Sequence, residues 1–119
     1  MFVMTGHQRE AFRARGFADL REALLAHVIE CFPARAAEFE AVALARHVED
    51  GMRRAEGHGL RLERDICAYV ELMIVFGSGF ETDPRCPWAT ALRPGEEHDP
   101  SARIQATFAG ALAALDAAP

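Results

Sequence analysis

Residues 64–88, RDICAYVELMIVFGSGFETDPRCPW, decide the fold of this chain. The first half of the stretch is apolar on nearly every side of a helix, which is typical of a helix at the centre of a core. Gly77 and Gly79 then end the helix, and the turn after them carries Phe80, Trp88 and two prolines. The stretch therefore predicts a buried helix closed by a packed turn, and it contains no nucleophile motif or phosphate loop.

Two charged residues interrupt the apolar surface of this helix. Arg64 and Glu71 lie two helical turns apart on the same side. Their spacing predicts a thin stripe that faces solvent, and Val75, one turn after Glu71, is expected to be exposed with it. The alternative is a desolvated Glu71 carboxylate that acts as a general acid or base.

Two amphipathic helices are predicted before the central one. The first runs from about residue 5 to residue 31, has Gly16 as a point where it kinks or splits, and ends before Pro33. A short helical turn is expected at residues 34–39. The second helix, at about residues 42–56, ends at Gly57. Its apolar face is formed by Val42, Ala45, Val48, Met52 and Ala55, and its charged face by Arg46, Glu49, Asp50, Arg53, Arg54 and Glu56.

Prolines organise the segment after the central helix. Asp83 is expected to accept hydrogen bonds in a turn before Pro84, and Pro87 is expected to begin a short helix that carries Trp88. A polar linker follows at residues 93–100. Asp99 and Pro100 within it predict the cap and the first residue of a last helix, whose apolar face is formed by Ile104, Phe108, Leu112 and Leu115.

Length and composition fit one globular domain. The chain has 119 residues, half of them hydrophobic and 26% charged, which is enough for one core and too little for two ordinary domains. No stretch as long as a β-strand alternates apolar and polar residues, and the sequence has no internal repeat. We therefore expect an all-α, single-domain helical bundle over residues 1–119, with four main helices plus one or two short helices.

Charge and cysteine usage narrow the class of function. The net charge is -5, so a basic patch for nucleic acid is not expected, and the 13 basic residues are all arginine, which excludes lysine Schiff-base chemistry. The apolar stretch at residues 66–80 is too short for a membrane span. Cys31, Cys67 and Cys86 form no CxxC pair, and the first residues lack the layout of a signal peptide, which predicts a cytoplasmic protein.

Three groups of side chains are candidates for reactive sites. Glu81 and Asp83 offer oxygen ligands beside glycines, but their spacing is not that of a calcium loop, and a turn cap by Asp83 is favoured. Ser78 lacks the strand and the motif of a nucleophile elbow. The third group, four histidines and one cysteine, has no spacing that builds a metal site, so we expect the histidines at the surface or at helix ends. Its members are His7, His27, His47, His58 and Cys67. No catalytic, cofactor or metal residue is assigned.

Aromatic residues around the turn leave a second function open. Tyr69, Phe80 and Trp88 are suited to line an apolar cavity as well as to fill one. A cavity with Glu71 or a histidine converging on it would favour a small ligand-binding or enzymatic bundle. Interdigitated rings would disfavour that alternative.

Two segments of the chain resemble a known family. FPARAAEFE at residues 32–40 and HVEDGMRRAEGHGLRLERDICAYVELMIVFGSGFETDPRCPWATAL at residues 47–92 are similar to small uncharacterised bacterial all-helical proteins that are often encoded beside type VI secretion effectors. The resemblance covers roughly residues 26–92, and His58 departs from the aromatic residue usual there. Its pattern includes Phe32-Pro33, Gly51, Arg54-Ala55, Glu63-Arg64-Asp65, Gly77, Phe80, Asp83-Pro84 and Pro87-Trp88-Ala89.

The resemblance implies a non-catalytic interaction protein. Its expected role is that of an accessory factor, chaperone or immunity partner of a type VI secretion effector, and its acidic charge suits a basic partner surface. The exposed faces of the two middle helices supply the candidate partner-binding residues Glu49, Arg53, Glu56, Glu71 and Val75. A homodimer formed through the C-terminal helix is a third possibility.

Overall fold

The computed structural model describes residues 16–93, 95 and 97–117. Within these residues every regular element is helical, in the order α2 (Phe17–Cys31), α3 (Pro33–Ala36), α4 (Ala41–Gly57), α5 (Glu63–Phe76), η1 (Phe80–Thr82), η2 (Pro87–Leu92) and α6 (Pro100–Ala117). The all-α prediction with four main helices is confirmed. The described part has three short helices, one more than expected, because the packed turn forms two separate 3-10 turns. The predicted helical residues before 16 lie outside the described part.

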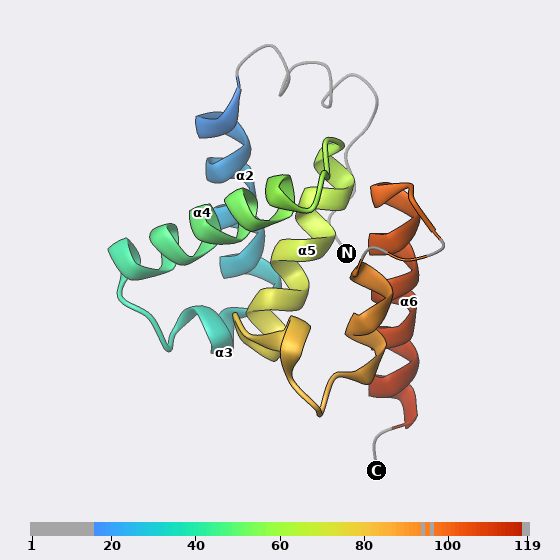
Figure 1. The fold of residues 1–119 in the computed structure, drawn as a ribbon. Helices are drawn as coiled ribbons and strands as arrows, with labels where there is room; N and C mark the ends of the chain where they lie inside the picture. Colours follow the sequence, from blue (N-terminus) through green and yellow to red (C-terminus); the bar gives the residue numbers. More distant parts are fainter. Residues whose placement is uncertain (1–15, 94, 96, 118–119) are drawn as a thin grey trace.

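The central position of α5 is confirmed. Figure 1 shows α5 with α4 crossing it on one side and α6 on the other, and α2 also packs on α5. From Glu63 to Ile74 every residue except Arg64 is buried. The rings of Tyr69 and Phe80 are fully buried beneath the turn that follows α5. None of the described helices is long and apolar enough to cross a membrane.

The solvent-facing stripe predicted on α5 is wrong. Arg64 is exposed, but Glu71 keeps only 5% of its surface and Val75 is half-buried. Arg64 and Glu71 are seven positions apart, so the two side chains share a helix side yet lie about 10 Å apart along the axis. Over that distance the covering element changes, because α2 places His27 against Glu71.

Helix α4 packs on α5 by a face shifted slightly from the predicted one. Val42 is 65% exposed, whereas Leu44, Val48 and Met52 are buried. The helix ends as expected in a glycine cap: Leu60 N–H donates to Ala55 O at 3.1 Å, and Gly59 N–H donates to Glu56 O at 2.9 Å. Gly59 has a φ of 85°, which a glycine adopts without strain. This cap turns the chain directly into α5.

The predicted start of α6 is also confirmed. Pro100 is its first residue, and the Asp99 carboxylate accepts a hydrogen bond from Ser101 N–H at 3.3 Å. Its predicted apolar face is only partly buried. Ile104 is fully buried, but Leu112 and Leu115 are about half exposed, at 49% and 50%.

Candidate functional site

The partner-binding residues predicted on α4 lie at the surface, and two of them, Glu49 and Arg53, belong to an ion-pair network. Glu49 accepts hydrogen bonds from Arg53 at 2.8 Å and from Arg21 of α2 at 3.4 Å. The Arg53 guanidinium beside it lowers the pKa of Glu49, and also lies 5.2 Å from the ring centroid of Phe17. Glu56 is exposed. These contacts join α4 to α2, and the role of the residues in partner binding stays a prediction.

The aromatic side chains of the turn fill space instead of lining it. The Phe80 ring lies 5.4 Å from the Tyr69 ring and 5.9 Å from the Trp88 ring, between centroids, and Phe76 contacts Trp88 at 4.8 Å. Because Tyr69 and Phe80 are fully buried and pack ring to ring, the interdigitated arrangement disfavours an aromatic-lined pocket. Gly77 ends α5, with its N–H donating to Met73 O at 2.9 Å.

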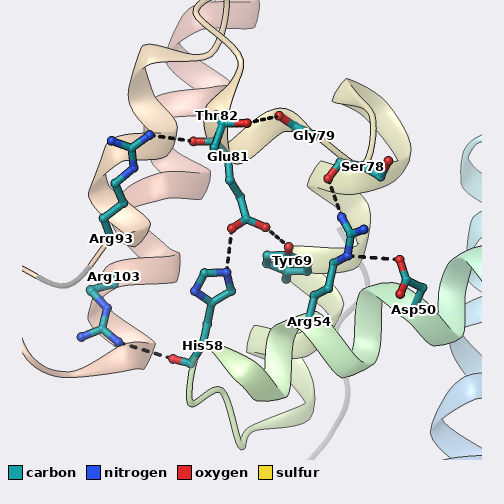
Figure 2. Close-up of polar contacts among 10 residues, drawn as sticks. All are labelled: Asp50, Arg54, His58, Tyr69, Ser78, Gly79, Glu81, Thr82, Arg93 and Arg103. Atoms are coloured by element: carbon teal, nitrogen blue, oxygen red, sulfur yellow. Dashed lines mark hydrogen bonds and ion pairs between the residues drawn. The ribbon is translucent and has the colours of Figure 1, made fainter.

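A polar cluster anchors the turn onto the bundle. Figure 2 shows Glu81 of η1 pointing at His58 and Tyr69: its carboxylate accepts a hydrogen bond from the Tyr69 hydroxyl and lies 2.8 Å from His58 Nε2. Burial, followed by the bond to Glu81, raises the pKa of Tyr69, so the phenol stays protonated and serves as a donor. The cluster is half-buried and ties η1 to α5 and to the end of α4.

Arginine side chains extend the same anchor through backbone carbonyls. Arg54 donates to Ser78 O at 2.6 Å and pairs with Asp50 at 3.1 Å, while Arg93 donates to Glu81 O at 3.3 Å (Figure 2). The bonds to Ser78 O and Glu81 O hold the turn in place, and Asp50 pairs with Arg54 within α4. The contacts of this cluster thus hold the turn in place, and a catalytic role is not needed to explain them.

The cation loop weighed for Glu81 and Asp83 is disfavoured by their contacts. Glu81 faces Tyr69, whereas Asp83 accepts hydrogen bonds from Arg85 N–H at 2.9 Å and from its guanidinium at 2.8 Å. Arg85 lowers the pKa of Asp83. The predicted turn cap by Asp83 is confirmed. The remaining turn prediction holds as well, since Pro87 begins η2, which carries Trp88, and Pro84 is exposed between the two 3-10 turns.

A second polar cluster lies inside the bundle, where the sequence predicted none. His27 Nε2 lies 3.4 Å from Glu71 Oε1, and Cys67 Sγ donates to the same oxygen at 3.3 Å. On the other side of the imidazole, His27 Nδ1 lies 3.4 Å from Cys31 Sγ. Burial, followed by the Glu71 charge, raises the pKa of the Cys67 thiol. The surface or helix-end position predicted for His27 is wrong, since it is 7% exposed.

The sequence carried a signal for this cluster. His27 and Cys31 are four residues apart on α2, and Cys67 and Glu71 are four residues apart on α5, a spacing that brings side chains together on one helix face. Neither pair has the His–His or CxxC spacing that is typical of a metal motif. That the two pairs face each other could be learned only from the packing of α2 on α5.

An apolar groove runs between α5 and α6. Its main cavity, of about 380 Å³, is lined by Leu72, Val75 and Phe76 of α5 and by Phe108, Ala111, Leu112 and Leu115 of α6, with Phe32 and Glu71 completing the wall. A second cavity of about 340 Å³ shares Phe108 and Leu112 and extends towards Arg64. The linings show that α5 and α6 run parallel. Two predicted partner-binding residues, Glu71 and Val75, therefore lie in the groove.

Comparisons with models of protein families, with curated proteins and with solved structures find no match to this chain. Its fold and surfaces define a class: a small all-helical domain with a firmly anchored turn, a buried polar cluster and an open apolar groove. All three features are formed by residues that the structure describes.

Proposed function

We propose that this chain acts by binding another protein, not by catalysis, and that the groove between α5 and α6 receives the partner. The observation that carries the proposal is the exposure of Leu112 and Leu115, each with about half of its surface in solvent beside the 380 Å³ cavity. Contiguous exposed apolar surface of this kind marks interaction sites, since burial yields about 25 cal/mol per Å².

The shape of the groove favours one occupant, an amphipathic helix of the partner. The two cavities accompany α6 from Gln105 to Leu115, which is about 15 Å of helix. A partner helix of about ten residues matches that length, and it would contact the groove with apolar residues spaced by three and four positions. The net charge of -5 favours a basic polar face on the same helix.

The class of partner follows from the resemblance to bacterial proteins encoded beside type VI secretion effectors. On that basis the partner is an effector, and the chain is its cytoplasmic accessory factor, chaperone or immunity protein. The acidic charge supports a basic effector surface. Glu49 and Arg53 are already paired with each other, so α4 contributes less binding energy than the groove.

The test compares the groove with a more exposed aliphatic position elsewhere. Leu112→Asp/Leu115→Asp places charge in the groove, and Val42→Asp places charge on α4, where Val42 is 65% exposed. Tagged proteins would recover partners from the native host, and the recovered effector would then be purified and titrated calorimetrically. We expect wild type and Val42→Asp to bind equally, and the groove variant to bind about 10–100-fold more weakly, since burying the exposed halves of two leucines contributes about 1.5–3 kcal/mol.

Other outcomes would overturn the proposal. Equal binding by the groove variant would place the interface elsewhere, and loss of binding in Val42→Asp alone would favour α4. A homodimer in light scattering that the groove variant abolishes would assign the groove to a second copy of this chain. Circular dichroism of each variant controls for folding, which the half-exposed positions of Leu112 and Leu115 should preserve. If the effector is toxic, co-expression distinguishes neutralisation from escort.

A further inference from the structure

The polar cluster between α2 and α5 has a composition unusual for the interior of a small bundle. An imidazole, a thiol and a carboxylate meet there, and His27, Cys67 and Glu71 are 7%, 0% and 5% exposed. Their nearest donor atoms all lie within 4.8 Å of one another. Burying such polar groups is costly unless they bind one another or a common ligand. The three groups offset this cost by binding one another, and a metal ion that replaces the Cys67 thiol proton would offset it as well.

The spacing of these atoms matches the edges of a tetrahedron around a metal ion. Ligands at usual zinc distances, about 2.0–2.3 Å, are about 3.3–3.6 Å apart when they are tetrahedrally arranged. The two distances to Glu71 Oε1 are 3.3 Å from Cys67 Sγ and 3.4 Å from His27 Nε2. The remaining edge, between His27 and Cys67, is at most 4.8 Å and closes by small side-chain rotations.

We propose that His27 Nε2, the Cys67 thiolate and a carboxylate oxygen of Glu71 bind one zinc ion between α2 and α5, with water as the fourth ligand and with release of the Cys67 thiol proton to solvent. The donor set of nitrogen, sulfur and oxygen is one that zinc uses, while calcium and magnesium require oxygen ligands. Cys31 orients the imidazole: its Sγ lies 3.4 Å from His27 Nδ1, so a proton on Nδ1 leaves Nε2 free of hydrogen to hold the metal.

The site has two structural consequences. Zinc would join α2 to α5 by metal–ligand bonds in addition to apolar contacts. Glu71 also lines the groove, so the metal would fix one wall of the surface proposed for partner binding. The zinc proposal does not rest on the proposed function, because it concerns the purified chain alone.

The first experiment titrates the purified, chelator-treated full chain with Co²⁺, which substitutes for zinc and reports a thiolate ligand by a charge-transfer band. We expect one equivalent bound, a spectrum of tetrahedral geometry, and displacement by Zn²⁺ but not by Mg²⁺ or Ca²⁺. Cys67→Ala and Glu71→Gln should each weaken binding by about 10–100-fold or more. The matched control is Cys86→Ala, which removes another buried thiol and should leave the titration unchanged.

A second measurement keeps the proposal falsifiable if a variant fails to fold. X-ray absorption of the zinc-loaded wild type should show one sulfur at about 2.3 Å together with nitrogen and oxygen ligands at about 2.0–2.2 Å. The proposal is overturned if the wild type binds no zinc, if its zinc has no sulfur ligand, or if binding survives Cys67→Ala and disappears in Cys86→Ala. Thermal unfolding of wild type with excess zinc should shift upward by several degrees.

Discussion

Replacement of Gly110 by alanine tests the closest approach between α6 and the turn. A Cβ on Gly110 would lie 2.7 Å from Trp88 Cβ and 3.7 Å from Trp88 Cα. Trp88 Cβ is attached directly to the backbone of η2, so no rotation of the tryptophan removes this overlap. Either α6 or η2 must shift, and the packing of Trp88 against Phe76 and Phe80 moves with them.

Two opposing contributions set the magnitude of this change. Alanine is favoured over glycine in a helix by about 1 kcal/mol, while overpacking costs about 1–3 kcal/mol. Because the contact at Gly110 is only 2.7 Å, we place its overpacking cost at the upper end of that range. We therefore expect the free energy of unfolding to fall by about 1–2 kcal/mol and Tm to fall by about 5 °C or more. Gly57→Ala, where no heavy atom lies within 4 Å of the added Cβ, should instead gain about 0.5 kcal/mol.

Urea unfolding followed by circular dichroism measures both variants. Opposite signs for the same substitution at Gly110 and Gly57 would separate packing from helix propensity. A Gly110→Ala protein at least as stable as wild type would refute the close contact of α6 with Trp88, since the helix-propensity gain would then act alone.

Three further outcomes are expected. Phe80→Ala should lose about 3–5 kcal/mol in urea unfolding, because Phe80 is fully buried; a loss below about 1 kcal/mol would contradict its burial. Burial lowers the pKa of His47 below 6.5, so the unfolded chain binds the proton more readily than the folded chain does. The free energy of unfolding should therefore decline as the pH falls below 6.5, and it should decline less steeply in His47→Gln. In the presence of a chelator, a thiol-reactive reagent should quickly modify one cysteine of the native chain, the exposed Cys31, because burial raises the pKa of Cys67 and Cys86. Three rapid adducts in intact-mass spectrometry would refute this expectation.

Helix ends were predicted well from the sequence because their signals act over a few residues. Asp99 caps α6 through a bond to Ser101, two positions away, and Gly59 closes α4 within the last turn. Pro33 likewise begins α3 directly after the break that follows α2. Such contacts are fixed by local backbone geometry, so the identity of the residue is enough to place them.

The polar cluster could not be placed in the same way. A projection of α5 shows which residues share a side with Glu71, but it does not show what covers that side at each level of the helix. That side of α5 is exposed to solvent at Arg64, whereas His27 of α2 packs on it at Glu71. The neighbour that decides burial is 44 residues distant in sequence, so it enters only with the packing of the two helices.

The groove arises from the different lengths of two parallel helices. Helix α6 has 18 residues and α5 has 14, so α6 extends further by about 6 Å. The periodicity of α6 predicted Leu112 and Leu115 as core residues, but α5 ends at Phe76, and every described residue after Ala111 is exposed. The apolar pattern thus continues past the element that would bury it. An additional helix packed against Phe76 and Leu115 would bury the apolar side chains that extend past the end of α5.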